Sequence, residues 1–203
     1  SNTNWQQTPQ IKKPGQHGQE MLLAIGHGAD ATMYFQWRKS LGAAEKMHGA
    51  VVDHGDAERT RVFQDIAAHG AFLKHLDGVV GTTVRPEVAI VYDWEVRWAL
   101  MYTQGLRQAA GRGVFDKEYL QTCQDHYRPF WKLGIPVDLI ESLSAFDRYK
   151  VVVAPMLFML KPGVADRLDA FVKRGGTLVL TYLSAIVNET ALVHRGGWPG
   201  GGL

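Results

Sequence analysis

The chain has 203 residues, of which 46% are hydrophobic and 21% are charged. This is the composition of a globular protein with a core of its own, which excludes a largely disordered chain. The formal net charge of +2 comes from 22 basic and 20 acidic residues mixed along the sequence, so no basic block is present to follow a nucleic-acid backbone.

The first seventeen residues contain two prolines and a glycine and show little periodicity, so we expect a surface loop. Apolar side chains then recur at helical spacing from Met21 to Ile25, and Gly26 and Gly28 follow as candidates for a C-terminal cap. The pattern predicts a short helix over 19–27.

Residues 31–37 are rich in aromatic and β-branched side chains and lack polar alternation. They predict a buried parallel strand directly after the helix. The next stretch, 38–55, is polar, contains three glycines and is too long for an ordinary connection in a compact domain unless it has a function. We therefore expect an active-site loop there.

A long amphipathic helix is predicted after this loop. Asp56 is a good N-cap residue, and apolar positions follow it at steps of four and three residues. These positions are Val62, Ile66, His69, Leu73 and Leu76. Strand, long loop and helix in this order form the unit of a (β/α) barrel, whose working loops follow the strands.

A different pattern begins at Pro86, and we place a domain boundary near 83–86, which gives domains over 1–84 and 85–203. The second domain is expected to contain strands over 88–92, 135–140, 150–155 and 177–182, and helices over 94–111, 116–133 and 164–173. Strands that alternate with helices imply an α/β domain with a doubly wound, mostly parallel sheet.

The only cysteine, Cys123, excludes an internal disulfide and fits a reducing compartment. An activated cysteine on such a sheet would suggest an amidotransferase, but that nucleophile needs a sharp turn between strand and helix. Cys123 falls inside a predicted helix, so a buried, inert thiol is favoured. No phosphate-binding glycine motif is present either. We predict no cofactor and a structural role for this domain.

The longest apolar stretches, such as 151–160, are too short to cross a bilayer, and no signal-peptide pattern opens the chain. We predict a cytoplasmic protein with neither a membrane nor a nucleic-acid partner. The polar start at Ser1 and the glycine-rich end at Leu203 close no structural element, so we expect a piece of a longer protein.

Glu45 and His48 lie three residues apart in the predicted loop and could face one ligand. A carboxylate and an imidazole can together hold neighbouring hydroxyl groups of a sugar. On spacing alone, a solvated polar loop is the stronger interpretation. A metal site has less support, because no second Glu-x-x-His motif or further ligand cluster is present.

Three aromatic residues, Trp5, Phe35 and Trp37, lie near the same predicted loop face. Aromatic rings pack well against the C–H faces of sugars. Each of these rings could equally belong to a core, so composition alone leaves both roles open.

Several short motifs in the first 54 residues occur together in a specific order. They are Asn4-Trp5, Lys13-Pro14-Gly15, His27-Gly28-Ala29-Asp30, the run from Met33 to Arg38 and the run from Glu45 to His54. In order and spacing they closely resemble the β-galactosidases of glycoside hydrolase family 42. From Pro86 onward the chain resembles, by less specific features, the middle domain of that family. There, an amidotransferase-like α/β domain has lost catalysis and serves in trimer formation.

The resemblance implies that 1–84 is the C-terminal portion of a catalytic (β/α)8 barrel and that 85–203 is an amidotransferase-like, flavodoxin-like trimerisation domain. It also implies a retaining glycosidase for terminal β-D-galactosides, with two carboxyl groups about 5 Å apart across the glycosidic bond. Both groups correspond to positions before Ser1, so no catalytic residue is expected in this chain, which alone should be inactive.

Four residues fall on the family's galactose-contacting positions, namely Trp5, Phe35, Glu45 and His48. The expected partners are therefore a β-galactoside and two further copies of the chain in a homotrimer. The family's cysteine zinc cluster lies outside this window, so no metal site is expected. Two alternatives stay open: a non-catalytic oligomerisation or interaction module, and, with less support, an amidotransferase-like enzyme.

Overall fold

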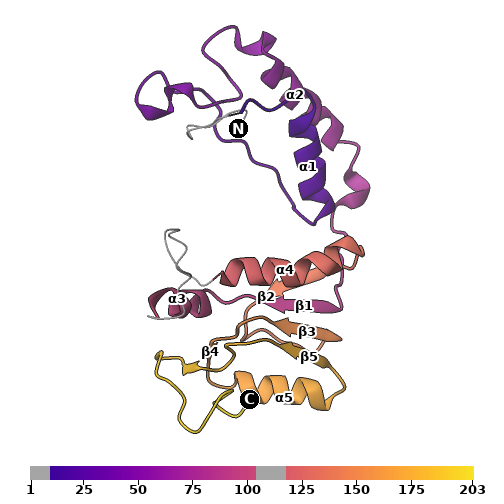
Figure 1. The fold of residues 1–203 in the computed structure, drawn as a ribbon. Coiled ribbons are helices and arrows are strands. Elements are labelled where there is room, and N and C mark those ends of the chain that lie inside the picture. The colour runs from indigo at the N-terminus through magenta and orange to yellow at the C-terminus, as the bar shows by residue number, and fades with distance from the viewer. Residues whose placement is uncertain (1–9, 104–117) are drawn as a thin grey trace. The chain divides into compact units, whose positions relative to one another are not determined.

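The computed structural model describes residues 10–103 and 118–203. The chain separates into two units, Ser1–Val84 and Arg85–Leu203 (Figure 1). Within the described residues, no helix has the combined length and apolar character needed to pass through a bilayer.

The first unit is built on two helices, α1 (Gln16–Gly26) and α2 (Arg61–Leu73), which pack against each other (Figure 1). Three short 3-10 helices accompany them: η1 (Ala44–Met47), η2 (Ala57–Arg59) and η3 (Asp77–Val79). The predicted first helix is confirmed, although it begins earlier, at Gln16. Its C-terminal end is followed by Gly28, whose φ of 93° is the left-handed conformation expected after a helix.

The predicted buried strand over 31–37 is wrong. Within the described residues, 31–37 contains no strand, and the isolated parallel bridge to Val52 is made by the next residue, Arg38. The side chains of 31–37 alternate between exposed and half-buried. A strand needs a continuous backbone partner, and the described neighbour is the short stretch 50–52. The apolar composition of the segment therefore did not indicate a fully buried position.

The predicted cap of the second helix is also wrong. Asp56 precedes the 3-10 helix η2 and makes no side-chain cap, whereas Thr60 Oγ1 accepts a hydrogen bond from Phe63 N at 3.3 Å and caps α2. The helix ends at Leu73, so Leu76 lies outside it. Asp56 and Thr60 are both good N-cap residue types, and the intervening turn of 3-10 helix decided between them.

The second unit contains a four-stranded parallel sheet in the order β2-β1-β3-β5. Its strands are β1 (Val88–Val91), β2 (Val137–Ile140), β3 (Val151–Ala154) and β5 (Thr177–Leu180). All four predicted strands are thus confirmed. A short parallel pair was missed, β4 (Met159–Leu160) and β6 (Val187–Asn188), because two-residue strands leave no periodic signal.

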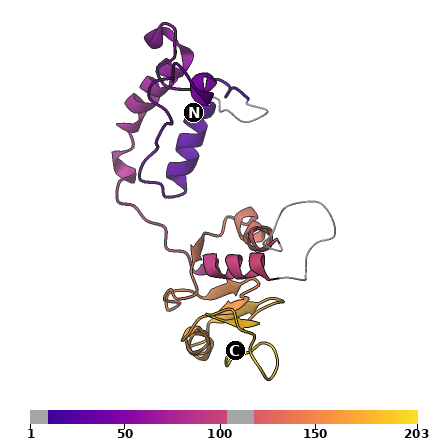
Figure 2. The same cartoon turned by 90° about the vertical axis from the view of Figure 1, so that its left-hand side faces the viewer.

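Helices cover both sides of this sheet. They are α3 (Trp94–Tyr102), α4 (Tyr119–Lys132) and α5 (Val164–Lys173). The helices α3 and α4 lie on one side and α5 on the other (Figure 2). The bounds of α5 are those predicted. The part of the predicted helices that falls in 104–117 lies outside the described residues.

The core of the second unit is closely packed between α5 and β5. Phe171 is 2% exposed and packs edge-to-face on Phe146 with ring centroids 6.2 Å apart. Gly176 lies directly over the Phe171 ring, because a Cβ atom built on this glycine would stand 2.3 Å from two of the ring carbons. Only a hydrogen in place of a side chain leaves room for this ring.

Gly176→Ala should therefore destabilise the second unit by about 1–3 kcal/mol, because the new methyl group forces a packed core ring to move. Gly70→Ala is the matched control. Gly70 is an exposed residue of α2 with nothing within 4 Å of a built Cβ, so the change should stabilise the first unit by up to about 1 kcal/mol. Calorimetric unfolding of both variants measures the effects, and equal behaviour of the two would contradict the packing argument.

Candidate functional site

The site predicted in the first unit centres on a contact between two rings. Phe35 and His48 lie with ring centroids 5.0 Å apart at an interplanar angle of 49°. His48 is 5% exposed, whereas Phe35 is 55% exposed. The phenyl ring therefore has a face open to solvent beside an imidazole that the protein largely encloses.

Backbone pairing brings these rings together. Val51 N donates to Gln36 O at 2.9 Å and Val52 N donates to Trp37 O at 2.7 Å, which joins the segment that carries Phe35 to the end of the loop. Lys39 N also donates to Val52 O at 3.0 Å. The intervening loop thus leaves and returns at one place, and His48 is carried back beneath Phe35.

Side chains close the base of the loop a second time. Lys39 Nζ lies 3.0 Å from Asp53 Oδ1, and the same oxygen accepts from His54 N at 2.7 Å. His54 Nε2 lies 2.8 Å from Ser40 O. Burial acts to raise the pKa of Asp53, but the hydrogen bonds from His54 and Lys39 and the charge of Lys39 outweigh it and lower that pKa. The carboxylate therefore stays ionised and holds the loop ends at neutral pH.

Glu45 lies on η1, the single 3-10 turn directly before His48. His48 N donates to Glu45 O at 2.8 Å, so the backbone fixes the spacing between the two residues. The side chain of Glu45 is half-buried, while Met47 in the same turn is 70% exposed. Within this turn Glu45 is therefore less exposed to solvent than Met47.

Three of the four predicted sugar contacts can be located. Phe35 and His48 touch, and Glu45 is tied to His48 through the backbone. Trp5 lies outside the described residues. Trp37, the other aromatic candidate, is 65% exposed. An apolar ring face beside a loop that carries an imidazole and a carboxylate can bind a sugar through its C–H face and its hydroxyl groups.

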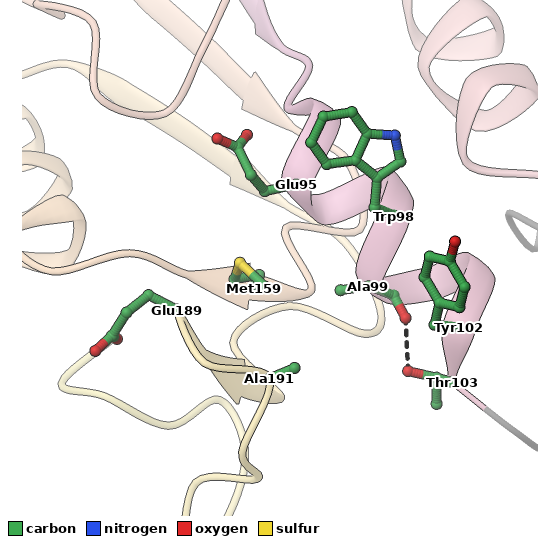
Figure 3. Close-up of a pocket in the computed structure, with 8 residues that line it drawn as sticks. All are labelled: Glu95, Trp98, Ala99, Tyr102, Thr103, Met159, Glu189 and Ala191. Atoms are coloured by element: carbon green, nitrogen blue, oxygen red, sulfur yellow. Dashed lines mark hydrogen bonds between the residues drawn. The ribbon is translucent and has the colours of Figure 1, made fainter.

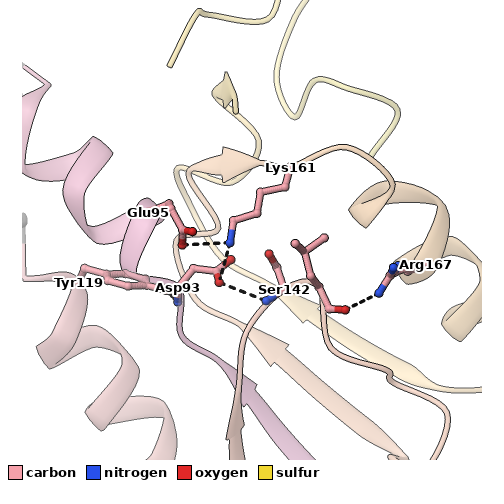
Figure 4. Close-up of polar contacts among 7 residues, drawn as sticks. Asp93, Glu95, Tyr119, Ser142, Lys161 and Arg167 are labelled. Atoms are coloured by element: carbon pink, nitrogen blue, oxygen red, sulfur yellow. Dashed lines mark hydrogen bonds and ion pairs between the residues drawn. The ribbon is translucent and has the colours of Figure 1, made fainter. Parts of the chain in front are cut away.

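A buried ion cluster in the second unit was not predicted (Figure 4). Lys161 Nζ lies 3.2 Å from Asp93 Oδ1 and 3.0 Å from Glu95 Oε2. The Asp93 side chain is 1% exposed, and its Oδ1 also accepts from Ser142 N at 3.3 Å. Asp93 follows β1, Ser142 follows β2 and Lys161 follows β4, so the cluster joins three strand ends. The sequence signal that could have indicated this cluster is Asp93, an acidic residue directly after a predicted apolar strand.

The contacts in this cluster shift the pKa values of Glu95 and Lys161. The hydrogen bond from Lys161 is the main cause that lowers the pKa of Glu95. Burial acts to lower the pKa of Lys161, but its bonds to Glu95 and Asp93 outweigh that effect and raise it. The Glu95 contribution to stability is present above the carboxyl group's unfolded pKa and is lost as the pH falls through the lowered value.

Cys123 has neither the turn position nor the exposure that an enzymatic nucleophile needs. It lies within α4 and is 4% exposed. Tyr119, one turn earlier, is fully buried, and its hydroxyl accepts a hydrogen bond from Asp93 N at 3.0 Å. Burial raises the pKa of Tyr119 far above its usual range. The predicted buried thiol is confirmed, and this part of the helix serves the core.

Comparison with known proteins identifies the class of this chain. Residues 86–201 match the sequence model of the β-galactosidase trimerisation domain, and residues 1–76 match the model of β-galactosidase. The chain therefore belongs to the β-galactosidases of glycoside hydrolase family 42.

Individual relatives support this family assignment. β-Galactosidase Pbg of Clostridium perfringens is 52% identical over 200 residues, which are 98% of this chain and 28% of that protein. β-Galactosidase BglY of Alicyclobacillus acidocaldarius is 49% identical over 198 residues, with the same two shares. The chain thus spans about 28% of the length of these relatives.

Solved structures show the same fold. The β-galactosidase from Bacillus circulans sp. alkalophilus superposes with a TM-score of 0.89 at 41% identity, over 98% of this chain and 29% of that one. A catalytic mutant of Gan42B, a β-galactosidase of the same family from G. stearothermophilus, gives 0.89 at 48% identity, over 97% of this chain and 28% of that one.

Lys161→Met should destabilise the second unit by about 3–5 kcal/mol, because it leaves the carboxylate of Asp93 buried without its cation. The double variant Lys161→Met/Asp93→Asn should recover most of that loss, since it removes both charges. Denaturant unfolding measures both. If the double variant were less stable than the single one, the ion pair would not be the cause.

Proposed function

We propose that this chain is the C-terminal portion of the catalytic (β/α)8 barrel, over 1–84, and the amidotransferase-like, flavodoxin-like trimerisation domain, over 85–203, of a cytoplasmic retaining β-galactosidase. The parent protein hydrolyses terminal β-D-galactosides. Its two catalytic carboxylates lie outside this chain, which is inactive by itself. The contact between Phe35 and His48 on a closed loop is the observation that carries the proposal.

Three features of the loop and of the segment before it fit a galactose-binding role. Phe35 offers a ring face for the C–H groups of the sugar, and Glu45 offers a carboxylate that accepts hydrogen bonds from its hydroxyl groups. His48 is enclosed beneath Phe35, so its ring is held in place before a ligand arrives. Trp5 completes the proposed set from the segment that precedes α1.

The proposed role of the second unit is trimer formation. Its match to the trimerisation domain supports this role. The position of Cys123 within α4 disfavours an amidotransferase-like enzyme. A pure interaction module remains the alternative, in which the loop from Lys39 to His54 would bind no sugar.

Glu45→Ala in the full-length protein should lower kcat/KM for an aryl β-galactoside roughly 10- to 100-fold, the loss expected when a charge-assisted hydrogen bond to substrate is removed. Glu58→Ala is the control, since Glu58 is an exposed acidic residue in η2. Steady-state kinetics measures both variants. Normal turnover by Glu45→Ala would remove Glu45 from the proposed site.

The purified 203-residue chain should have the mass of three copies in light scattering at high protein concentration. The expectation rests on the match of residues 86–201 to the trimerisation domain. Dilution should shift the mass toward one copy if the assembly is reversible. A single-copy mass at all concentrations would argue against trimer contacts in this chain.

A further inference from the structure

A pocket in the second unit has no role in the proposed galactose site (Figure 3). Its cavity of about 490 Å³ lies between α3 and the segments of β4 and β6. Two aromatic side chains, two carboxylates and a small apolar floor line it. These groups belong to Glu95, Trp98, Tyr102, Met159, Glu189 and Ala191.

The topology of the sheet places this pocket where ligands bind in parallel α/β proteins. After β1 the chain moves outward to β2, and after β3 it moves in the opposite direction to β5. The direction therefore reverses between β1 and β3, and a crevice forms outside the carboxyl ends of these two strands. The helix α3 directly follows β1, and Met159 of β4 follows β3, so the pocket lies at that reversal.

The aromatic wall is held in place from the core outward. Tyr92 stacks on the fully buried Tyr119 with ring centroids 5.2 Å apart, and Trp94 packs on Tyr92 at 5.6 Å. Trp98 then packs on Trp94 at 6.2 Å. Trp98 and Tyr102 are one helical turn apart and are 52% and 82% exposed. Large rings that are anchored yet open to solvent are suited to stacking on a ligand.

The Glu189 carboxylate is carried on a turn that one side chain fixes. Asn188 Oδ1 accepts hydrogen bonds from Thr190 N at 3.0 Å, Thr190 Oγ1 at 2.8 Å and Leu192 N at 2.9 Å. Asn188 N also donates to Leu192 O at 2.9 Å. Glu189 is exposed within this turn, so it can accept hydrogen bonds from a ligand without losing a structural contact that the turn requires.

The Glu95 carboxylate is already partly neutralised, because Lys161 Nζ lies 3.0 Å from it. A purely cationic ligand would compete with Lys161 for that group. A purely apolar ligand would desolvate both carboxylates without pairing them, which is costly. A neutral ring with several hydroxyl groups avoids both problems, since it donates hydrogen bonds to Glu95 and Glu189 and lays its C–H face on Trp98 or Tyr102.

We propose that this pocket is a second carbohydrate site, which binds a neutral sugar ring through Trp98, Tyr102, Glu95 and Glu189. It goes beyond the proposed function, because all its residues belong to the second unit. It involves no chemical step. Sugar binding here is independent of Phe35, Glu45 and His48, so either site can fail without the other.

The test uses the 203-residue chain with isotope-labelled tryptophan, whose six indole N–H signals report on separate places. The Trp98 signal is assigned by its loss in Trp98→Phe. Titration with methyl β-D-galactopyranoside should shift the Trp98 signal along a saturable curve. Trp131, exposed on α4 outside the pocket, should not respond. Glu45→Ala should leave the Trp98 response unchanged, which separates this site from the galactose site.

Glu189→Gln should weaken this binding about tenfold, the cost of weakening a charge-assisted hydrogen bond, and Tyr102→Ala should also weaken it. Glu141→Gln, a change at an exposed carboxylate that does not line the pocket, should have no effect. The proposal is overturned if the sugar leaves Trp98 unshifted, or if Glu189→Gln and Tyr102→Ala bind it normally. A shift of the Trp98 signal with methylguanidinium but not with the sugar would also overturn it, since the occupant would then be a basic side chain. A shift with protein concentration alone would overturn it too, since the occupant would then be a second copy of the chain.

Discussion

The backbone pairing between 36–39 and 51–52 is the constraint on which the candidate site of the first unit depends. Three hydrogen bonds of 2.7–3.0 Å and one parallel bridge fix the two ends of a polar loop at one place. Without that closure, a segment with three glycines would sample many conformations, and fixing it on binding would cost conformational entropy. Because the loop is already closed, His48 is enclosed under Phe35 before any ligand is present.

In the second unit, side chains instead of backbone pairing fix the segments that follow the strands. Its sheet is parallel, so the carboxyl ends of its strands meet at one edge and their polar termini must be satisfied there. Lys161 does this by pairing with Asp93 and Glu95, while Tyr119 accepts the hydrogen bond from Asp93 N. Within the cluster the Asp93 side chain is buried, whereas the Glu95 side chain is 49% exposed. One charge network thus joins the core to the surface pocket.

The second unit was predicted from sequence far better than the first. Strands such as 88–91 and 151–154 are continuous apolar runs between helices, and that signal is local. The segment 31–37 carries a similar composition, yet its state depends on whether a neighbouring strand is present, which is not a local property. The same limit applies to the site. The spacing of Glu45 and His48 was visible, but the contact of His48 with Phe35 depends on a backbone closure that no motif encodes.

The pocket beside α3 lies at an edge that the topology of the sheet creates. The reversal of chain direction between β1 and β3 opens a crevice whatever residues follow the strands. An amidotransferase would require a nucleophile at such an edge, and the cysteine of this chain is instead buried in α4. This edge instead carries a row of packed aromatic rings that ends at Trp98. It also carries two carboxylates, of which Glu95 is paired with Lys161. The chemistry of such a surface suits the recognition of hydroxyl groups.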